Sequence, residues 1–359
     1  ITCRDWSSDV CSSDLFISLI KRVANNILLP DAQVLWWPHT FLLLGKLLKQ
    51  NNYATVLVSG PPFSSFFLVA FIAKRYGVPA VIDYRDEWSF SRDNWENTVK
   101  TSFARFVDSW MERYVVRNAK VITVASPYYE RTLKERFPAA ADKIHTITNG
   151  YDPEDFTGVD FFSAPEIADG RFTLLYTGTV WRATSFKGLL GGVRLLAANY
   201  PDKAARLNLR ILGRTVQEEF DTIDQLKALI HVETRDYVPH AEIFQELASA
   251  DGLLLTLADL PGAGKIIPGK VFEYLATPLP VLAIVPEGVT VDILKDEKNV
   301  QMAVPGDAAA ISTLLLSLLD ASQTKSIRDG VEKYSRPHLT GKLVNALEDI
   351  NVGSRKETQ

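Results

Sequence analysis

The chain has 359 residues, of which 47% are hydrophobic, so it is long enough for two domains with a full core each or for a single TIM barrel. Its formal net charge of −4 is small and spread along the sequence, which gives no indication of a nucleic-acid partner or an acidic tail. The apolar runs are short or are interrupted by Lys and Arg, so we expect no transmembrane helix.

Both cysteines, Cys3 and Cys11, lie in an unusual N-terminal segment. The run at residues 5–15, DWSSDVCSSDL, resembles the translation of a sequencing-library adapter, so we interpret residues 1–15 as a non-native segment. On that interpretation the chain begins partway through its first domain. The remaining residues contain no cysteine, which excludes a disulfide and a thiolate metal site and favours a reducing cytoplasm.

The first half of the chain alternates between helical and strand-like patterns. Short apolar runs predict strands at residues 54–59, 80–83, 120–125 and 144–148. Helical spacing predicts helices at residues 16–50, with a break near Pro30, and at residues 64–76, 98–118 and 127–137. We therefore expect an N-terminal, Rossmann-like domain at residues 16–150 that is incomplete.

Residues 151–170 carry six acidic residues and no clear period, so they are the best linker candidate. A second series follows, with strands predicted at residues 172–176, 207–212, 252–257, 281–285 and 300–304 and helices between them. We expect a C-terminal domain at residues 171–335, a final helix at 336–350 and a disordered polar tail at 351–359.

Strands that alternate with helices at this spacing are typical of parallel sheets with helices on both faces. The sequence therefore predicts the α/β class, with two doubly wound, Rossmann-like domains. Ligands of such sheets bind at the carboxyl ends of the strands, so a reaction would take place in a cleft between the two domains.

The central candidate site is the stretch at residues 265–285, KIIPGKVFEYLATPLPVLAIV. Gly269 precedes a short helix, whose first backbone N–H groups lack internal partners and favour a phosphate. Lys265 and Lys270 add positive charge, and Glu273 could accept two hydrogen bonds from the vicinal hydroxyls of a ribose. The alternative is an amphipathic helix with a solvated Glu and two surface lysines.

A second candidate lies after the strand at residues 172–176. Gly178 and Thr179 allow a close backbone approach to a ligand, and Arg182 and Lys187 could clamp a diphosphate and neutralise it as a leaving group. A solvated loop is the alternative. Gly213 follows the next strand and either forms the floor of the site or is only a turn.

In the first half, Arg85 and Asp86 follow directly after a predicted strand, where residues of a cleft belong. The alternative is an ion pair that fixes the loop. No metal site is expected, because the histidines are scattered and lack the spacing of metal ligands: His39, His145, His231, His240 and His338.

Motifs of other enzyme classes are missing from the sequence. There is no G-x-G-x-x-G after a strand, which disfavours a dinucleotide dehydrogenase, and no G-x-x-x-x-G-K-[ST], which disfavours a P-loop kinase. No G-x-S-x-G elbow of an α/β-hydrolase occurs either.

Six motifs together resemble the retaining GT-B glycosyltransferases of family 4. They are SGPPFS at residues 59–64, DYRDEW at 83–88, VITVASP at 121–127, ITNGYD at 147–152, YTGT at 176–179 and PGKVFEYLA at 268–276. The resemblance runs from about residue 29 to the last helix. It implies two Rossmann-like domains that face a cleft, of which the C-terminal one binds a nucleotide sugar without a metal ion or another cofactor.

The resemblance also implies roles for several of the candidate residues. Glu273 matches the carboxylate that holds the ribose, Arg182 and Lys187 fall at the diphosphate clamp, and Val238 lies near the base. Two positions depart from the family pattern. Lys265 stands where members commonly have a first glutamate, eight positions before Glu273, and Arg85 stands where many have a His.

The implied activity is transfer of a sugar, with retention, from a nucleotide diphosphate sugar to a carbohydrate or lipid-linked acceptor, in cell-surface polysaccharide or glycolipid synthesis. A GT-B nucleotide-sugar epimerase and a non-catalytic nucleotide-binding remnant remain alternatives. We expect a cytoplasmic protein, with peripheral contact at the inner face of the membrane left open. The aromatic and basic stretch at residues 103–117 suits such contact, and a helix that faces the core is its alternative.

Overall fold

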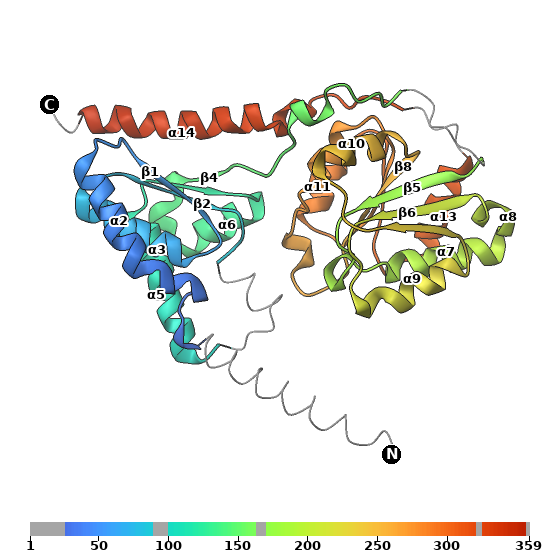
Figure 1. Ribbon diagram of the computed structural model, residues 1–359, viewed down its shortest axis with the longest axis horizontal. Coiled ribbons are helices and arrows are strands. Elements are labelled where there is room, and N and C mark those ends of the chain that lie inside the picture. Colours follow the sequence, from blue (N-terminus) through green and yellow to red (C-terminus); the bar gives the residue numbers. More distant parts are fainter. Residues whose placement is uncertain (1–25, 89–99, 163–169, 321–324, 357–359) are drawn as a thin grey trace, which may run out of the picture. The chain divides into compact units, whose positions relative to one another are not determined.

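The computed structural model describes residues 26–88, 100–162, 170–320 and 325–356. The chain divides into two compact units, Ile1–Thr148 with Gly341–Gln359, and Asn149–Thr340. Each unit is a parallel sheet with helices packed on it; in Figure 1 the first is coloured blue to green, with its last residues in red, and the second runs from green to red. The segment predicted to be non-native, residues 1–15, lies outside the described residues.

Four parallel strands form the sheet of the first unit, in the order β1-β2-β3-β4. The strands are β1 (Val56–Gly60), β2 (Ala80–Tyr84), β3 (Val121–Val124) and β4 (Ile144–Thr146). The helices are η1 (Ala32–Trp36), α2 (Trp37–Gln50), α3 (Ser64–Tyr76), α5 (Ser102–Asn118), α6 (Pro127–Arg136) and η2 (Pro138–Lys143). Every strand predicted for this half is present, because each one is a short apolar run with turn residues at its ends.

The two faces of this sheet bury alternate residues of its strands. Ile82 and Ile122 pack with α3, α5 and α6 in the main core. Val81 and Val121 point to the opposite face, where Ala346 and Leu347 of the last helix pack on them. That helix, α14 (Arg336–Lys356), runs six residues past the predicted end at 350, so residues 351–356 of the expected tail are helical.

Part of the expected linker is packed on the second unit. Phe161 is buried in its core, and Phe156, which ends η3 (Pro153–Phe156), lies edge-on against Phe244 at a centroid distance of 4.8 Å. Tyr151 forms a backbone bridge with Ser335. The acidic composition did not predict this packing, because a few apolar residues are enough to fix an otherwise polar segment. Residues 163–169 lie outside the described part.

Six parallel strands form the sheet of the second unit, in the order β10-β9-β8-β5-β6-β7. The strands are β5 (Phe172–Thr177), β6 (Leu207–Leu212), β7 (His231–Arg235), β8 (Gly252–Thr256), β9 (Val281–Ile284) and β10 (Val300–Ala303). The order reverses direction between β5 and β8, as in a doubly wound Rossmann sheet, and such a switch point is where ligands bind. The α/β prediction is thereby confirmed.

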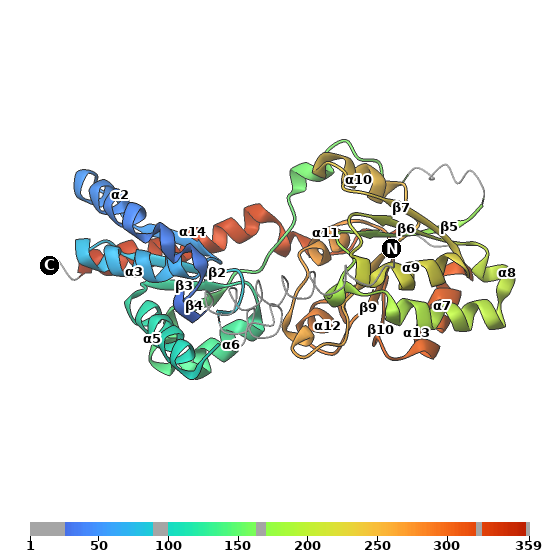
Figure 2. The same cartoon turned by 60° about the horizontal axis from the view of Figure 1, so that its bottom comes forward.

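Helices cover both faces of this sheet, as Figure 2 also shows. Those of one face are α7 (Lys187–Asn199), α9 (Phe220–Lys227) and α13 (Ala308–Asp320). Those of the other are α10 (His240–Ala248), α11 (Lys270–Ala276) and α12 (Val289–Leu294). Shorter pieces are η4 (Arg182–Thr184), α8 (Pro201–Ala204), η5 (Gln217–Glu219), η6 (Ala263–Lys265) and η7 (Val331–Tyr334).

One buried arginine fixes the end of α11. Arg328 is 1% exposed, and among the described residues its guanidinium donates to backbone carbonyls only. Its acceptors are Lys298, Tyr274, Leu275, Thr277, Leu279 and Asn299. Three of them belong to the last turn of α11 and its exit, where carbonyls lack helical partners and a cation is favoured.

We expect Arg328→Met to destabilise the second unit by at least about 3 kcal/mol, because it leaves several buried carbonyls without a donor. Urea unfolding followed by circular dichroism measures the change. The matched control is Arg206→Met at an exposed position, which should stay within about 0.5 kcal/mol of the parent. Equal effects of the two substitutions would show that Arg328 does not hold this end of α11.

Candidate functional site

The carboxyl ends of β5 and β6 form two stacked glycine turns. Gly178 and Gly213 have φ values of +115° and +134°, which disfavour other residue types. The amide of Gly178 donates to the Leu212 carbonyl at 2.7 Å, and a Cβ on Gly213 would lie 2.5 Å from the Gly178 carbonyl oxygen. Position 213 therefore requires a glycine, because the Gly178 carbonyl lies too close to leave room for a Cβ. This contact supports the turn at Gly178.

Lys270, at the start of α11, is directed at this pair of turns. Its ammonium donates to the Thr177 carbonyl and lies 3.8 Å from the centroid of the Tyr176 ring. Burial lowers the pKa of Lys270 to about 7, although the nearby Glu273 carboxylate acts in the opposite direction and raises this pKa. Lys270 thus ties α11 to the end of β5, a contact that sequence spacing could not show.

Tyr274 makes a second link between α11 and β5. Its buried hydroxyl accepts from the Thr177 amide and is hydrogen-bonded to the Thr177 side chain, both at 3.1 Å. Sequence reasoning missed this residue. The available signal was a tyrosine in a helix of otherwise apolar neighbours, because a buried phenol needs a polar partner.

Glu273 is half-buried on α11, and its carboxylate makes no hydrogen bond to another described residue. Burial and the nearby Asp155 carboxylate raise the pKa of Glu273, while His240, Lys270 and Arg336 lower it. His240, which sequence reasoning did not select for the site, pairs with Asp155 at 3.1 Å.

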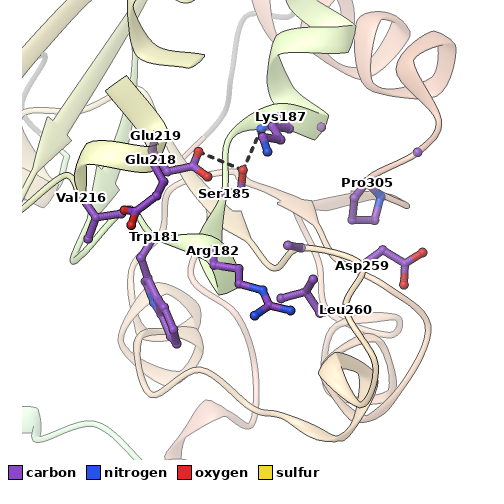
Figure 3. Close-up of a pocket in the computed structure, with 13 residues that line it drawn as sticks. Trp181, Arg182, Ser185, Lys187, Val216, Glu218, Glu219, Asp259, Leu260 and Pro305 are labelled. Carbon is purple, nitrogen blue, oxygen red and sulfur yellow. Dashed lines mark hydrogen bonds between the residues drawn. The ribbon is translucent and has the colours of Figure 1, made fainter. Parts of the chain in front are cut away.

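A pocket of about 850 Å³ opens at the switch point of the sheet (Figure 3). Loops after β5, β6, β8 and β10 line it, with residues Trp181, Arg182, Ser185, Lys187, Gly188, Val216, Glu218, Glu219, Ala258, Asp259, Leu260, Pro305 and Gly306. In Figure 3 the guanidinium of Arg182 extends toward Leu260, and Lys187 stands at the start of α7. The two predicted clamp residues therefore share one pocket.

The start of α7 is held in place by buried groups at the edge of this pocket. The Ser185 hydroxyl donates to the Glu219 carboxylate at 2.9 Å and accepts from the Lys187 amide at 3.3 Å (Figure 3). Glu219 is 2% exposed. Because α7 has 13 residues and α11 only seven, α7 presents the stronger helix N-terminus to an anion.

The other predicted residues lie at strand ends around these groups. The Thr179 carbonyl accepts from Tyr176 at 2.9 Å and from Thr184 at 2.7 Å, which fixes the loop that leads to Arg182. Val238 is buried in the core between β7 and α10. Lys265 ends η6 and is half-buried, and Gly269 precedes α11 at an exposed position.

In the first unit, Asp83 organises the carboxyl ends of three strands. Its carboxylate accepts from Ser59 at 2.8 Å, from Thr123 at 2.6 Å and from Arg85 at 2.5 Å. Arg85 also donates to the Ile147 carbonyl at 2.9 Å. Sequence reasoning selected Arg85 and the exposed Asp86 and overlooked Asp83, which is the charged partner of Arg85.

Comparisons with known proteins agree with this architecture. Residues 3–155 match the family described as Glycosyltransferase Family 4. No curated protein matches the sequence. Of the solved structures, HepE of Anabaena in complex with UDP has a TM-score of 0.60 at 15% identity, over 86% of this chain and 82% of its own.

Two further structures have the same fold. A trehalose-6-phosphate synthase, described in a study of glycosyl transfer with retention, has a TM-score of 0.56 at 12% identity, over 87% of this chain and 78% of its own. An E. coli protein described as trehalose-6-phosphate bound with UDP-2-fluoro glucose has a TM-score of 0.58 at 11% identity, over 87% and 77%.

Identities this low show the fold alone. The resemblance predicted from the sequence is confirmed: the chain has the fold of the GT-B glycosyltransferases, and its residues 3–155 carry the match to family 4.

Proposed function

We propose that the chain transfers a sugar, with retention and without a metal ion, from a nucleotide diphosphate sugar to a carbohydrate or lipid-linked acceptor. The product would be a cell-surface polysaccharide or a glycolipid. The observation that carries the proposal is the pocket at the switch point between β5 and β8, which holds Arg182 and Lys187 beside the first turn of α7. Two cations and a helix N-terminus suit a diphosphate, although three acidic residues, Glu218, Glu219 and Asp259, line the same pocket.

Glu273 would hold the nucleoside. Its carboxylate has no hydrogen-bond partner among the described residues, and two vicinal ribose hydroxyls would supply two donors. At the ends of β5 and β6, the donor would contact the backbone of Gly178, Thr179 and Gly213. Lys265 and Gly269 would lie along the sugar diphosphate, and the backbone at Val238 near the base. The UDP and UDP-2-fluoro glucose in the similar structures support a nucleotide ligand.

The charges suggest how the reaction would proceed. The bond between the anomeric carbon and the diphosphate oxygen breaks, and its electron pair stays on the phosphate. The acceptor oxygen bonds to the anomeric carbon on the same face, and its proton passes to the departing phosphate oxygen. Arg182 and Lys187 stabilise the negative charge that grows on the leaving group. Arg85, held by Asp83, and Asp86 are proposed on the acceptor side.

The stereochemistry can be tested by proton NMR of the full chain with UDP-glucose and water as the acceptor. We expect slow release of glucose whose first-formed anomer is α, together with UDP. A β anomer would contradict retention. A new nucleotide sugar without release of UDP would instead identify an epimerase.

Donor binding should depend on the protonation of Lys270. Its ammonium form is present below the pKa of about 7, and a bound diphosphate would raise that pKa because it adds negative charge nearby. Affinity for UDP-glucose should therefore be highest below pH 7 and fall as the pH rises through 7. Lys270→Arg stays charged between about pH 5 and 9, so its affinity should not fall as the pH rises through 7. Calorimetric titrations across this range check it, and the same fall in the Arg variant would contradict the assignment.

A further inference from the structure

An aromatic band crosses the surface of three neighbouring helices in the first unit. Phe67 of α3 lies at its centre, with ring centroids 5.4 Å from Trp37 of α2, 5.5 Å from Trp110 of α5 and 5.1 Å from Tyr114 of α5. Phe71 of α3 continues the band, 6.3 Å from Phe41 of α2. We call the exposed surface of these helices the α2–α3–α5 face.

This face exposes large apolar side chains that the core does not use. Leu42, Phe103 and Phe106 are 72%, 71% and 69% exposed. The others are Phe41, Leu43, Leu47, Phe71, Tyr76 and Trp110. Phe103, Phe106 and Trp110 follow one another at helical spacing, so they form a stripe along α5. An exposed apolar surface of this extent marks an interaction site.

All the exposed charge on the three helices is positive. Their basic residues are Lys46, Lys49, Lys74, Arg75, Arg105, Arg113 and Arg117, and each is exposed. Their acidic residues, Asp108 and Glu112, are buried and paired with Lys100 and Arg136. A chain with a net charge of −4 therefore places seven cations on these three helices beside the exposed apolar side chains, and none of the seven forms an ion pair with an acidic residue in the part of the chain that the structure describes.

A shallow pocket of about 450 Å³ lies on the same face between α2 and α3. Its apolar side is formed by Phe41, Leu42 and Tyr76, and Lys46 and Lys49 stand beside them. This combination suits a phosphate head group with the first part of its acyl chains, because Lys binds the phosphate while aromatic side chains prefer the boundary between water and hydrocarbon.

We propose that the α2–α3–α5 face binds the surface of an anionic lipid bilayer. The aromatic and leucine side chains enter the head-group region, and the seven cations attract the lipid phosphates. None of the described helices has the length and hydropathy to cross a bilayer, so the contact lies at the surface. The proposed surface includes residues 103–117, which the sequence already indicated, and adds residues of α2 and α3. The proposal does not depend on the donor site.

A second copy of the chain is a poorer occupant of this face. A two-fold interface would bring the same cations opposite one another with no acidic residue to pair with them. A nucleic acid would use the basic and aromatic residues, but it gives Leu42, Leu43 and Leu47 nothing to bury against. An anionic bilayer provides phosphates that pair with the cations and an apolar region in which the aliphatic side chains are buried.

The test is cosedimentation of the full chain with vesicles of phosphatidylcholine alone and with about one third phosphatidylglycerol. We expect sedimentation with the anionic vesicles only, weakened by salt. Lys46→Gln with Lys49→Gln should lower the partition coefficient about 25-fold, because each cation near an anionic surface contributes about fivefold. Phe103→Ser with Phe106→Ser should lower it at least about tenfold.

Matched controls come from the second unit. Lys295→Gln with Lys298→Gln, and Phe220→Ser, change exposed residues of the same types and should bind like the parent. Circular dichroism melting shows that each variant is folded. No sedimentation of the parent, or equal losses in the controls, would overturn the proposal. So would sedimentation-velocity data in which the parent is a dimer that Phe103→Ser with Phe106→Ser dissociates, or binding of a single-stranded oligonucleotide in place of vesicles.

Discussion

Replacing Lys187 by Ala should lower kcat by about 100- to 1,000-fold while changing the Kd of the donor by less than about tenfold. Lys187 stands with Arg182 in the pocket at the switch point, at the start of α7. Negative charge on the diphosphate increases as the glycosidic bond breaks, so a cation at this place stabilises the transition state more than the bound donor.

Steady-state turnover of the donor and calorimetric titration with UDP separate the two effects. Arg182→Ala should behave in the same way, because both side chains face one pocket. Lys227→Ala removes an exposed lysine of α9 and serves as the matched control. Equal losses of kcat and of donor affinity in Lys187→Ala would mean that Lys187 only binds the donor, and the leaving-group role would then be wrong.

Glu273→Gln should weaken nucleotide binding about 10- to 150-fold, because hydrogen bonds to a charged acceptor contribute about 1.5 to 3 kcal/mol. The substitution keeps the shape of the side chain and removes its charge. Glu242→Gln, an exposed position on α10, is the matched control and should bind like the parent.

A ligand that lacks one ribose hydroxyl sharpens this test. The parent should bind 2′-deoxyuridine diphosphate more weakly than UDP, whereas Glu273→Gln should bind the two with nearly equal affinity. Such a cycle isolates the contact between the carboxylate and the hydroxyl. If the parent and Glu273→Gln lose the same factor when the hydroxyl is removed, Glu273 does not hold the ribose.

The fold was predictable wherever a strand is a short apolar run. The strand β7 was not, because its sequence HVETR has a single apolar residue and lies at the edge of the sheet. An edge strand buries little, so its composition resembles that of a loop. The extension of α14 to Lys356 was missed for the same reason, since the polar residues at its end carry no apolar period.

The sequence predicted which strand ends carry the candidate site residues. It did not predict most of the side-chain contacts that these residues make. Arg182 and Lys187 share a pocket because the loop after β5 turns directly into α7. The partner of Arg85 is Asp83, and Lys270 donates to the end of β5. Arg328 reaches α11 from more than 50 residues away along the chain. Such contacts depend on tertiary packing, which periodicity and spacing do not encode.

The most direct test of the proposed function is a calorimetric titration of the full chain with UDP, GDP, dTDP and ADP in the presence of a chelator. We predict saturable binding of one nucleotide without metal, weakened by Glu273→Gln and unchanged by Glu242→Gln. Binding of none of the four by the folded chain, or binding that the loss of the Glu273 carboxylate leaves unchanged, would contradict the assignment of this site to a nucleotide sugar.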